Sequence, residues 1–154
     1  MCAVQMSERL AVQTYENDVS AWAFEQALFL RTRRFELLDI EHIADELENV
    51  GKREQRELAR GLARLLAQLL KWQYQPTQRD TSLTWCILAL RREISYTLGE
   101  SPSLAPKLQE PHLLGVVWAQ AVAQFALETG LDCFPGDCPW VIESEVLAEA
   151  WLPL

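Results

Sequence analysis

The chain has 154 residues, the size of one ordinary domain, and can bury roughly two thirds of the surface that its unfolded form exposes. With 14 Lys and Arg against 22 Asp and Glu, its formal net charge of −8 argues against nucleic acid as a partner. It has no secretory signal and no apolar run near the ~18 residues that span a bilayer, so we expect a cytoplasmic protein without membrane contact.

The four cysteines are few and irregularly spaced, which favours reduced thiols over a disulfide framework. Cys133 and Cys138 could supply two zinc ligands, but no neighbouring Cys or His completes a tetrahedral set. We therefore expect no cofactor.

Apolar residues recur at three- and four-residue steps, glycine is scarce, and prolines mark segment ends. This pattern predicts an all-α fold, a compact bundle of about five to seven helices in a single domain over residues 1–154. We expect residues 1 to about 14 to form a loosely ordered N-terminal arm.

The first predicted helix follows the N-cap Asp18 and runs to about Arg34. Its inward side is apolar and consists of Val19, Trp22, Ala23, Phe29 and Leu30. Asp39 caps a second helix, which Gly51 either ends or kinks. Here the predicted inward stripe consists of Ile40, Ile43, Leu47 and Val50, and the outward acidic residues are Glu41, Asp45 and Glu48.

A long central helix is predicted over about 52–74 and stops before Pro76, which lacks the amide hydrogen that would continue it. One side of this helix is apolar: Leu58, Leu62, Leu65, Leu66, Leu69 and Trp72. The opposite side is basic: Arg53, Arg56, Arg60, Arg64 and Lys71.

Asp80, Thr81 or Ser82 caps the next helix, which Gly99 ends at about Leu98. Its core side consists of Ile87, Leu90, Ile94 and Leu98. Further helices are predicted at about 101–108, at 111–129 before Gly130, and at about 141–150.

The chain contains a series of short motifs, called landmarks, in this order: Tyr15-x-x-Asp18, Trp22, Arg34-Phe35, Leu38-Asp39, Ile43-x-x-Glu46-Leu47-Glu48, Gly51, LLKWQYQP at 69–76, SPSL, ETGL, Phe134-Pro135 and Cys138-Pro139. By these the chain resembles the bacterial family called domain of unknown function 29, from about Tyr15 to Pro153. The resemblance implies a small helical fold and brings no activity, substrate or cofactor. Gln68 departs from it, standing where many members have His, and His42 stands where Asn is common.

The strongest ligand-like cluster lies on the predicted second helix, where steps of three and four can aim side chains at one cation. Its candidate metal ligands are Glu41, His42, Asp45 and Glu48, with Glu46 beside them. The same spacing is typical of a solvated acidic face or of a partner contact. A paired-metal bundle would also need Glu-x-x-His motifs on other helices, and the sequence lacks them.

The basic side of the long helix, with Arg53, Arg56, Arg60 and Arg64, could bind phosphate or an acidic partner, or it could simply face water. Most of the six tryptophans are expected in the core, whereas Trp140 and Trp151 lie outside the best helical stripes and are candidate contacts for a partner.

Neither His42 nor His112 stands in a recognisable catalytic motif, and the sequence has no glycine-rich phosphate loop. We therefore expect a non-enzymatic module that binds a protein partner or self-associates as a homo-oligomer. The alternative is a metal-dependent enzyme, hydrolytic in type, that uses the acidic cluster.

Overall fold

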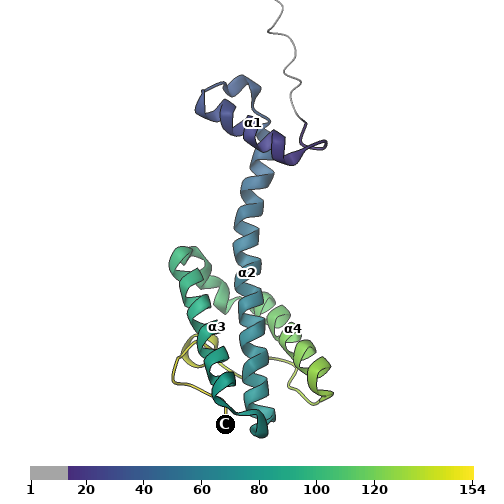
Figure 1. Cartoon of the computed structure of the whole chain (residues 1–154), viewed down its shortest axis with the longest axis vertical. Coiled ribbons are helices and arrows are strands. Elements are labelled where there is room, and N and C mark those ends of the chain that lie inside the picture. The colour runs from purple at the N-terminus through teal and green to yellow at the C-terminus, as the bar shows by residue number, and fades with distance from the viewer. Residues whose placement is uncertain (1–13) are drawn as a thin grey trace, which may run out of the picture. The chain divides into compact units, whose positions relative to one another are not determined.

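The computed structural model describes residues 14–154, and these residues form helices, turns and loops without a strand (Figure 1). The prediction of an all-α fold is confirmed. The predicted N-terminal arm lies, except for its last residue, outside the described residues, as does Cys2. No helix in the described range is both long enough and apolar enough to cross a bilayer.

The main elements are four α-helices: α1 (Val19–Arg31), α2 (Ile40–Tyr74), α3 (Thr81–Glu100) and α4 (Pro111–Thr129). Three 3₁₀ segments connect them: η1 (Phe35–Leu37), η2 (Pro76–Gln78) and η3 (Pro102–Gln109). A π-helical turn, η4 (Ile142–Val146), follows near the C-terminus.

Local signals place most helix ends as predicted. The Asp18 and Asp80 side chains accept hydrogen bonds from the backbone N–H groups of Ala21 and Leu83 at 2.9 and 2.7 Å. Gly130 closes α4 in the left-handed region, at φ 71°.

The first helix ends earlier than predicted, at Arg31 instead of Arg34. Arg33 adopts a left-handed conformation at φ 58°, and the Arg34 N–H donates back to the Phe29 carbonyl at 2.9 Å. This is the geometry that closes many helices, although glycine usually occupies the left-handed position.

The chain divides into two compact units, Met1–Gly51 and Lys52–Leu154, called here the N-terminal and C-terminal units. Helix α2 contributes residues to both. The expectation of a single domain stays a prediction.

The core of the C-terminal unit is built on the apolar side of α2 that the sequence predicts. Its leucines, from Leu58 to Leu70, are at most 1% exposed, and Trp72 is half-buried against them. Helices α3 and α4 cover this side with Ile87, Leu90, Ile94, Val117, Ala121 and Phe125. Cys86, Cys133 and Cys138, the cysteines among the described residues, are free thiols.

Gly51 does not end a helix, so the two helices predicted on either side of it are one. A single glycine in a helix costs only about 1 kcal/mol relative to alanine, and the residues that follow it, Lys52, Arg53 and Glu54, are charged helix formers. Likewise, Gly99 does not end α3, which continues to Glu100.

The predicted inward stripe of the N-terminal half of α2 is wrong for three of its four residues, while the fourth, Ile43, is half-buried. Ile40, Leu47 and Val50 are 65%, 68% and 54% exposed. In α1, Trp22 and Phe29 are buried as predicted, but Val19 and Leu30 are nearly half exposed. Periodicity identifies an apolar side of a helix but does not show whether anything covers it.

Arg91 on α3 holds the C-terminal segment in place. It is 2% exposed, and its guanidinium donates to the backbone carbonyls of Val146, Glu149 and Trp151 at 2.8, 3.0 and 2.6 Å. Burial lowers the pKa of Arg91, and Glu149 opposes that shift. Because these carbonyls bond to Arg91, the helix predicted over 141–150 is reduced to η4.

We expect Arg91→Met to lower the free energy of unfolding by about 3 kcal/mol, because three carbonyls lose a charged donor. Urea denaturation followed by circular dichroism measures the loss. The neighbouring Arg92 is exposed and is the matched control, for which Arg92→Met should change stability by less than about 0.5 kcal/mol. Equal effects of both substitutions would contradict the role of Arg91.

Two glycines should respond oppositely to alanine. A Cβ at Gly51 would meet no atom within 4 Å, so Gly51→Ala should stabilise the protein by about 0.5–1 kcal/mol. Gly130→Ala should destabilise it by about 1 kcal/mol, because alanine is strained at a φ of 71°. Thermal unfolding of both variants tests the pair, and a destabilised Gly51→Ala would contradict an uninterrupted α2.

Candidate functional site

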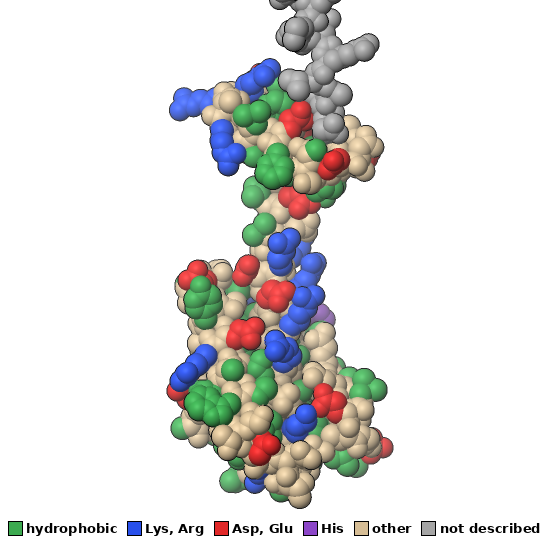
Figure 2. All heavy atoms as spheres, in the orientation of Figure 1, with side chains coloured by type: hydrophobic (Ala, Val, Ile, Leu, Met, Phe, Trp, Pro, Cys, Tyr) green, Lys and Arg blue, Asp and Glu red, His purple; other side chains and the backbone are tan. Residues whose placement is uncertain are grey.

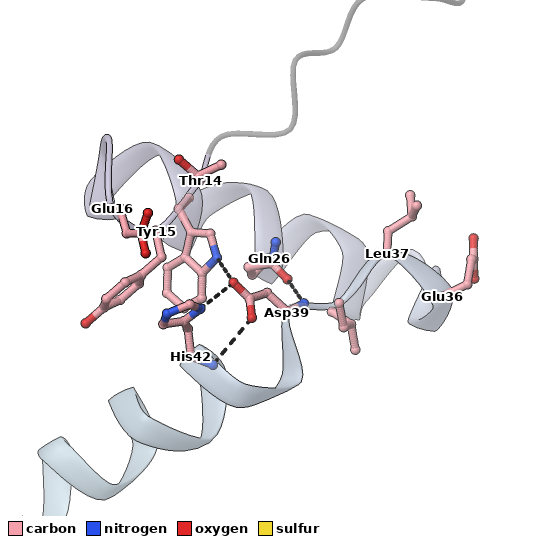
Figure 3. A pocket seen from close by; sticks show the side chains of 10 residues that line it. Thr14, Tyr15, Glu16, Gln26, Glu36, Leu37, Asp39 and His42 are labelled. Carbon is pink, nitrogen blue, oxygen red and sulfur yellow. Dashed lines mark hydrogen bonds and ion pairs between the residues drawn. The ribbon is translucent and has the colours of Figure 1, made fainter.

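The N-terminal unit contains a polar cluster around Asp39, at the start of α2 (Figure 3). The indole N–H of Trp22 donates to Asp39 Oδ2 at 3.2 Å, and His42 Nδ1 lies 2.7 Å from the same oxygen. In a neutral imidazole, the carboxylate therefore favours a proton on Nδ1 and leaves Nε2 as an acceptor.

Asp39 is also the predicted cap of α2. Its Oδ1 accepts from the His42 backbone N–H at 3.4 Å. Its own backbone N–H donates to Gln26 Oε1 on α1 at 2.8 Å. These bonds tie α1 to the first turn of α2, and we call Trp22, Gln26, Asp39 and His42 the clasp.

Tyr15 covers the clasp from outside. Its ring stacks on His42, with centroids 4.2 Å apart and planes 17° apart, and meets Trp22 edge-on at 5.0 Å. Its hydroxyl donates to Glu46 Oε1 at 2.5 Å. This hydrogen bond, together with burial and the negative charges of Glu46 and Asp45, raises the pKa of Tyr15.

Gln26 is the polar side chain that this unit buries, with 2% exposure. Its oxygen is bonded to Asp39, whereas its Nε2 is buried without a hydrogen-bond partner. A buried unpaired donor costs about 1–3 kcal/mol, so the clasp is held in spite of a local defect.

The Asp39 carboxylate is stabilised in its charged form. Desolvation works to raise its pKa, but the hydrogen bonds from His42 and Trp22 outweigh it and leave the pKa below its usual value. Asp39 is thus an anion that orients His42 and Trp22.

A shallow pocket of about 360 Å³ lies beside the clasp and also borders Thr14, Glu16, Glu36, Leu37 and Leu38. Thr14 brings a hydroxyl to this lining, which includes neither serine nor cysteine. Two of the hydrogen bonds of Asp39 join it to α1, one from the Trp22 indole and one from its own backbone N–H to Gln26 Oε1. Those with His42 lie within the first turn of α2. Through these two bonds to α1 the clasp joins α1 to the start of α2.

The sequence shows the parts of the clasp but not the assembly. Asp39 is predicted as a cap, and Tyr15 and Trp22 stand among the family landmarks. Gln26 was missed. The one available signal is its position four residues after Trp22, on the same side of α1.

A family model described as "Domain of unknown function DUF29" matches residues 14–152. The chain belongs to this family. Searches of curated proteins and of solved structures found no match. DUF29 membership agrees with the resemblance of the landmarks, and the family description assigns no activity.

The candidate metal ligands do not converge. Glu41, Asp45 and Glu48 are exposed, while His42 is turned to Asp39. Within residues 14–154, no group of three or more His, Cys, Asp or Glu side chains could hold a metal ion. The metal-dependent enzyme therefore gains no support from the donor geometry of this DUF29 chain.

The basic residues Arg53, Arg56, Arg60 and Arg64 are all exposed on α2. Arg60 pairs with Glu57 at 2.7 Å, and Arg64 lies 3.9 Å from Glu93. Lys71 is half-buried and binds Glu128 at 2.8 Å, which lowers the pKa of that carboxyl.

Trp140 and Trp151 are half-buried rather than exposed as partner contacts. They form an edge-to-face row with Trp118, with centroid distances of 5.8 and 5.7 Å. Their role in binding a partner stays a prediction.

The clasp should be sensitive to acid. Because the pKa of Asp39 is lowered in the folded protein, its stabilisation is complete above the unfolded value of about 3.9 and is lost as the pH falls through the folded value. Asp39→Asn should lower stability at pH 7 and flatten the pH dependence below about pH 4.

The state of the clasp can be followed by proton–nitrogen NMR. The chemical shift of the Trp22 indole N–H reports its hydrogen bond to Asp39 as the pH is lowered. Glu41→Gln, at an exposed carboxyl on the same helix, is the control and should leave that resonance unchanged. A Trp22 resonance indifferent to Asp39→Asn would contradict the clasp.

Proposed function

We propose that the protein is a non-enzymatic interaction module whose N-terminal unit binds a protein partner through an exposed apolar face. This face consists of large exposed apolar side chains. Phe24 and Leu28 come from α1, and Ile40, Leu47 and Val50 come from α2. Figure 2 shows apolar side chains on the visible surface of this unit.

The observation that carries the proposal is the imbalance between buried and exposed apolar groups. Between residues 14 and 51, the buried side chains are Trp22, Gln26 and Phe29. Eight large apolar side chains in the same range are exposed, and Phe24 reaches 77%. Units of about 40 residues rarely bury enough surface to be stable alone, so cover from a partner would add the missing burial.

The stripe of Ile40, Ile43, Leu47 and Val50 has the spacing of a helix–helix seam, with steps of three, four and three. We call it the α2 stripe. Covering one such side chain fully would contribute about 1.5–3 kcal/mol. We further propose a cytoplasmic location, since the thiols at Cys86, Cys133 and Cys138 are unpaired.

Substitution of Leu47 tests this function. Leu47 is 68% exposed, so Leu47→Lys should keep the fold, within about 0.5 kcal/mol, while placing a charge in the binding face. Affinity capture on the immobilised chain, read by mass spectrometry, and light scattering of the purified protein measure association.

We expect the wild type to retain a specific protein or to self-associate, and Leu47→Lys to lose that binding by at least about tenfold. Leu127→Lys is the matched control, because Leu127 is 89% exposed in the C-terminal unit. If the wild type and Leu47→Lys bind alike in both assays, the proposal fails.

A further inference from the structure

A groove on the C-terminal unit is lined by basic residues, whereas the residues beside the α2 stripe are acidic. It lies between α2 and α4 and has a volume of about 390 Å³. Its basic rim consists of Lys52, Arg56 and Arg60, and its apolar lining consists of Ala59, Leu113 and Val116. We call it the α2–α4 groove.

The groove is open and basic. Val116 is 43% exposed, and Arg56 and Arg60 are exposed on the rim. The residues that line it include no acidic side chain. Figure 2 shows Lys and Arg side chains along this part of α2 with Asp and Glu side chains beside them, and Arg60 pairs with Glu57 at 2.7 Å. Such a surface fits an apolar helix side with acidic flanks.

The chain itself carries a helix of that kind. Between Phe35 and Gly51, every charged residue other than His42 is acidic: Glu36, Asp39, Glu41, Asp45, Glu46 and Glu48. Glu41 and Glu48 each follow an apolar stripe residue, which puts them about 100° around the helix from it. If the α2 stripe lay in the α2–α4 groove, the carboxylates of Glu41 and Glu48 would therefore lie near the basic rim of the groove.

The two surfaces also agree in length. Ile40 to Val50 spans about 15 Å of helix, and the groove residues of α2, Lys52 to Arg60, span about 12 Å. We propose that the α2 stripe of one molecule docks in the α2–α4 groove of a second copy. This inference rests on the proposed function, because it names the partner of the same apolar face.

The contact joins two different surfaces. If each of two copies docks its stripe in the other's groove, the result is a closed dimer. If each copy docks in the groove of a further copy, the result is an open head-to-tail assembly. In either case the ionic part of the contact weakens with salt, whereas the apolar part does not.

Paired variants test the inference in the full-length protein. Leu47→Lys disables the stripe, and Arg56→Glu with Arg60→Glu disables the groove. Val116→Glu disables the groove lining independently of those two arginines. Arg64→Glu, at an exposed arginine that does not line the groove, is the control. Circular dichroism confirms that each variant is folded.

We expect light scattering at low salt to show a dimer or larger species for the wild type and Arg64→Glu. The stripe variant and both groove variants should associate at least about tenfold more weakly. Mixing the stripe variant with a groove variant should restore a one-to-one complex, because the mixture contains one intact stripe and one intact groove. Stripe-to-stripe pairing could not be restored in this way.

Two outcomes overturn the inference and leave the proposed function standing. In the first, Leu47→Lys abolishes self-association but the groove variants do not, so that the stripe pairs with another surface. In the second, the wild type is a monomer up to about 100 µM, yet capture of a different protein depends on Leu47. Failure of the proposed function is distinct, because then Leu47→Lys has no effect in either assay.

Discussion

Burial of one side of α2 is the contact on which the C-terminal unit depends. Leu58, Leu62, Leu65 and Leu69 are at most 1% exposed beneath α3 and α4. Truncating any one of them would cost about 2–5 kcal/mol, which is comparable to the whole stability of many domains. Arg91 completes this core because it fixes the C-terminal segment, whose Ile142 and Val146 are buried against the same cluster.

The same helix has an apolar side in the N-terminal unit as well, but there the side is exposed. The difference lies in the neighbours and not in the periodicity, since Ile40, Leu47 and Val50 follow the spacing of the buried leucines. A helix is stabilised chiefly by packing of its apolar side, so the N-terminal half of α2 lacks much of the support that the C-terminal half has. This contrast is the observation that supports the proposal of association.

The sequence predicts features that depend on near neighbours and misses those that depend on distant ones. Pro111 and Gly130 set the bounds of α4 correctly, because a first-turn proline and a left-handed glycine act locally. The clasp joins Trp22 to Asp39, 17 residues apart, and no local pattern reports that contact. The helix expected near the C-terminus is lost to Arg91, which lies 55 residues before Val146.

The clasp explains why the apolar stripe is left uncovered. Asp39, His42 and Glu46, spaced three and four residues apart, share the side of α2 that contacts α1 and Tyr15. The stripe residues follow these three by one position each, which turns the stripe about 100° away from the side held by the clasp. A polar joint thus selects the orientation of α2 at the expense of apolar burial within the unit. By this argument the exposure of Ile40 and Leu47 follows from how the unit is built.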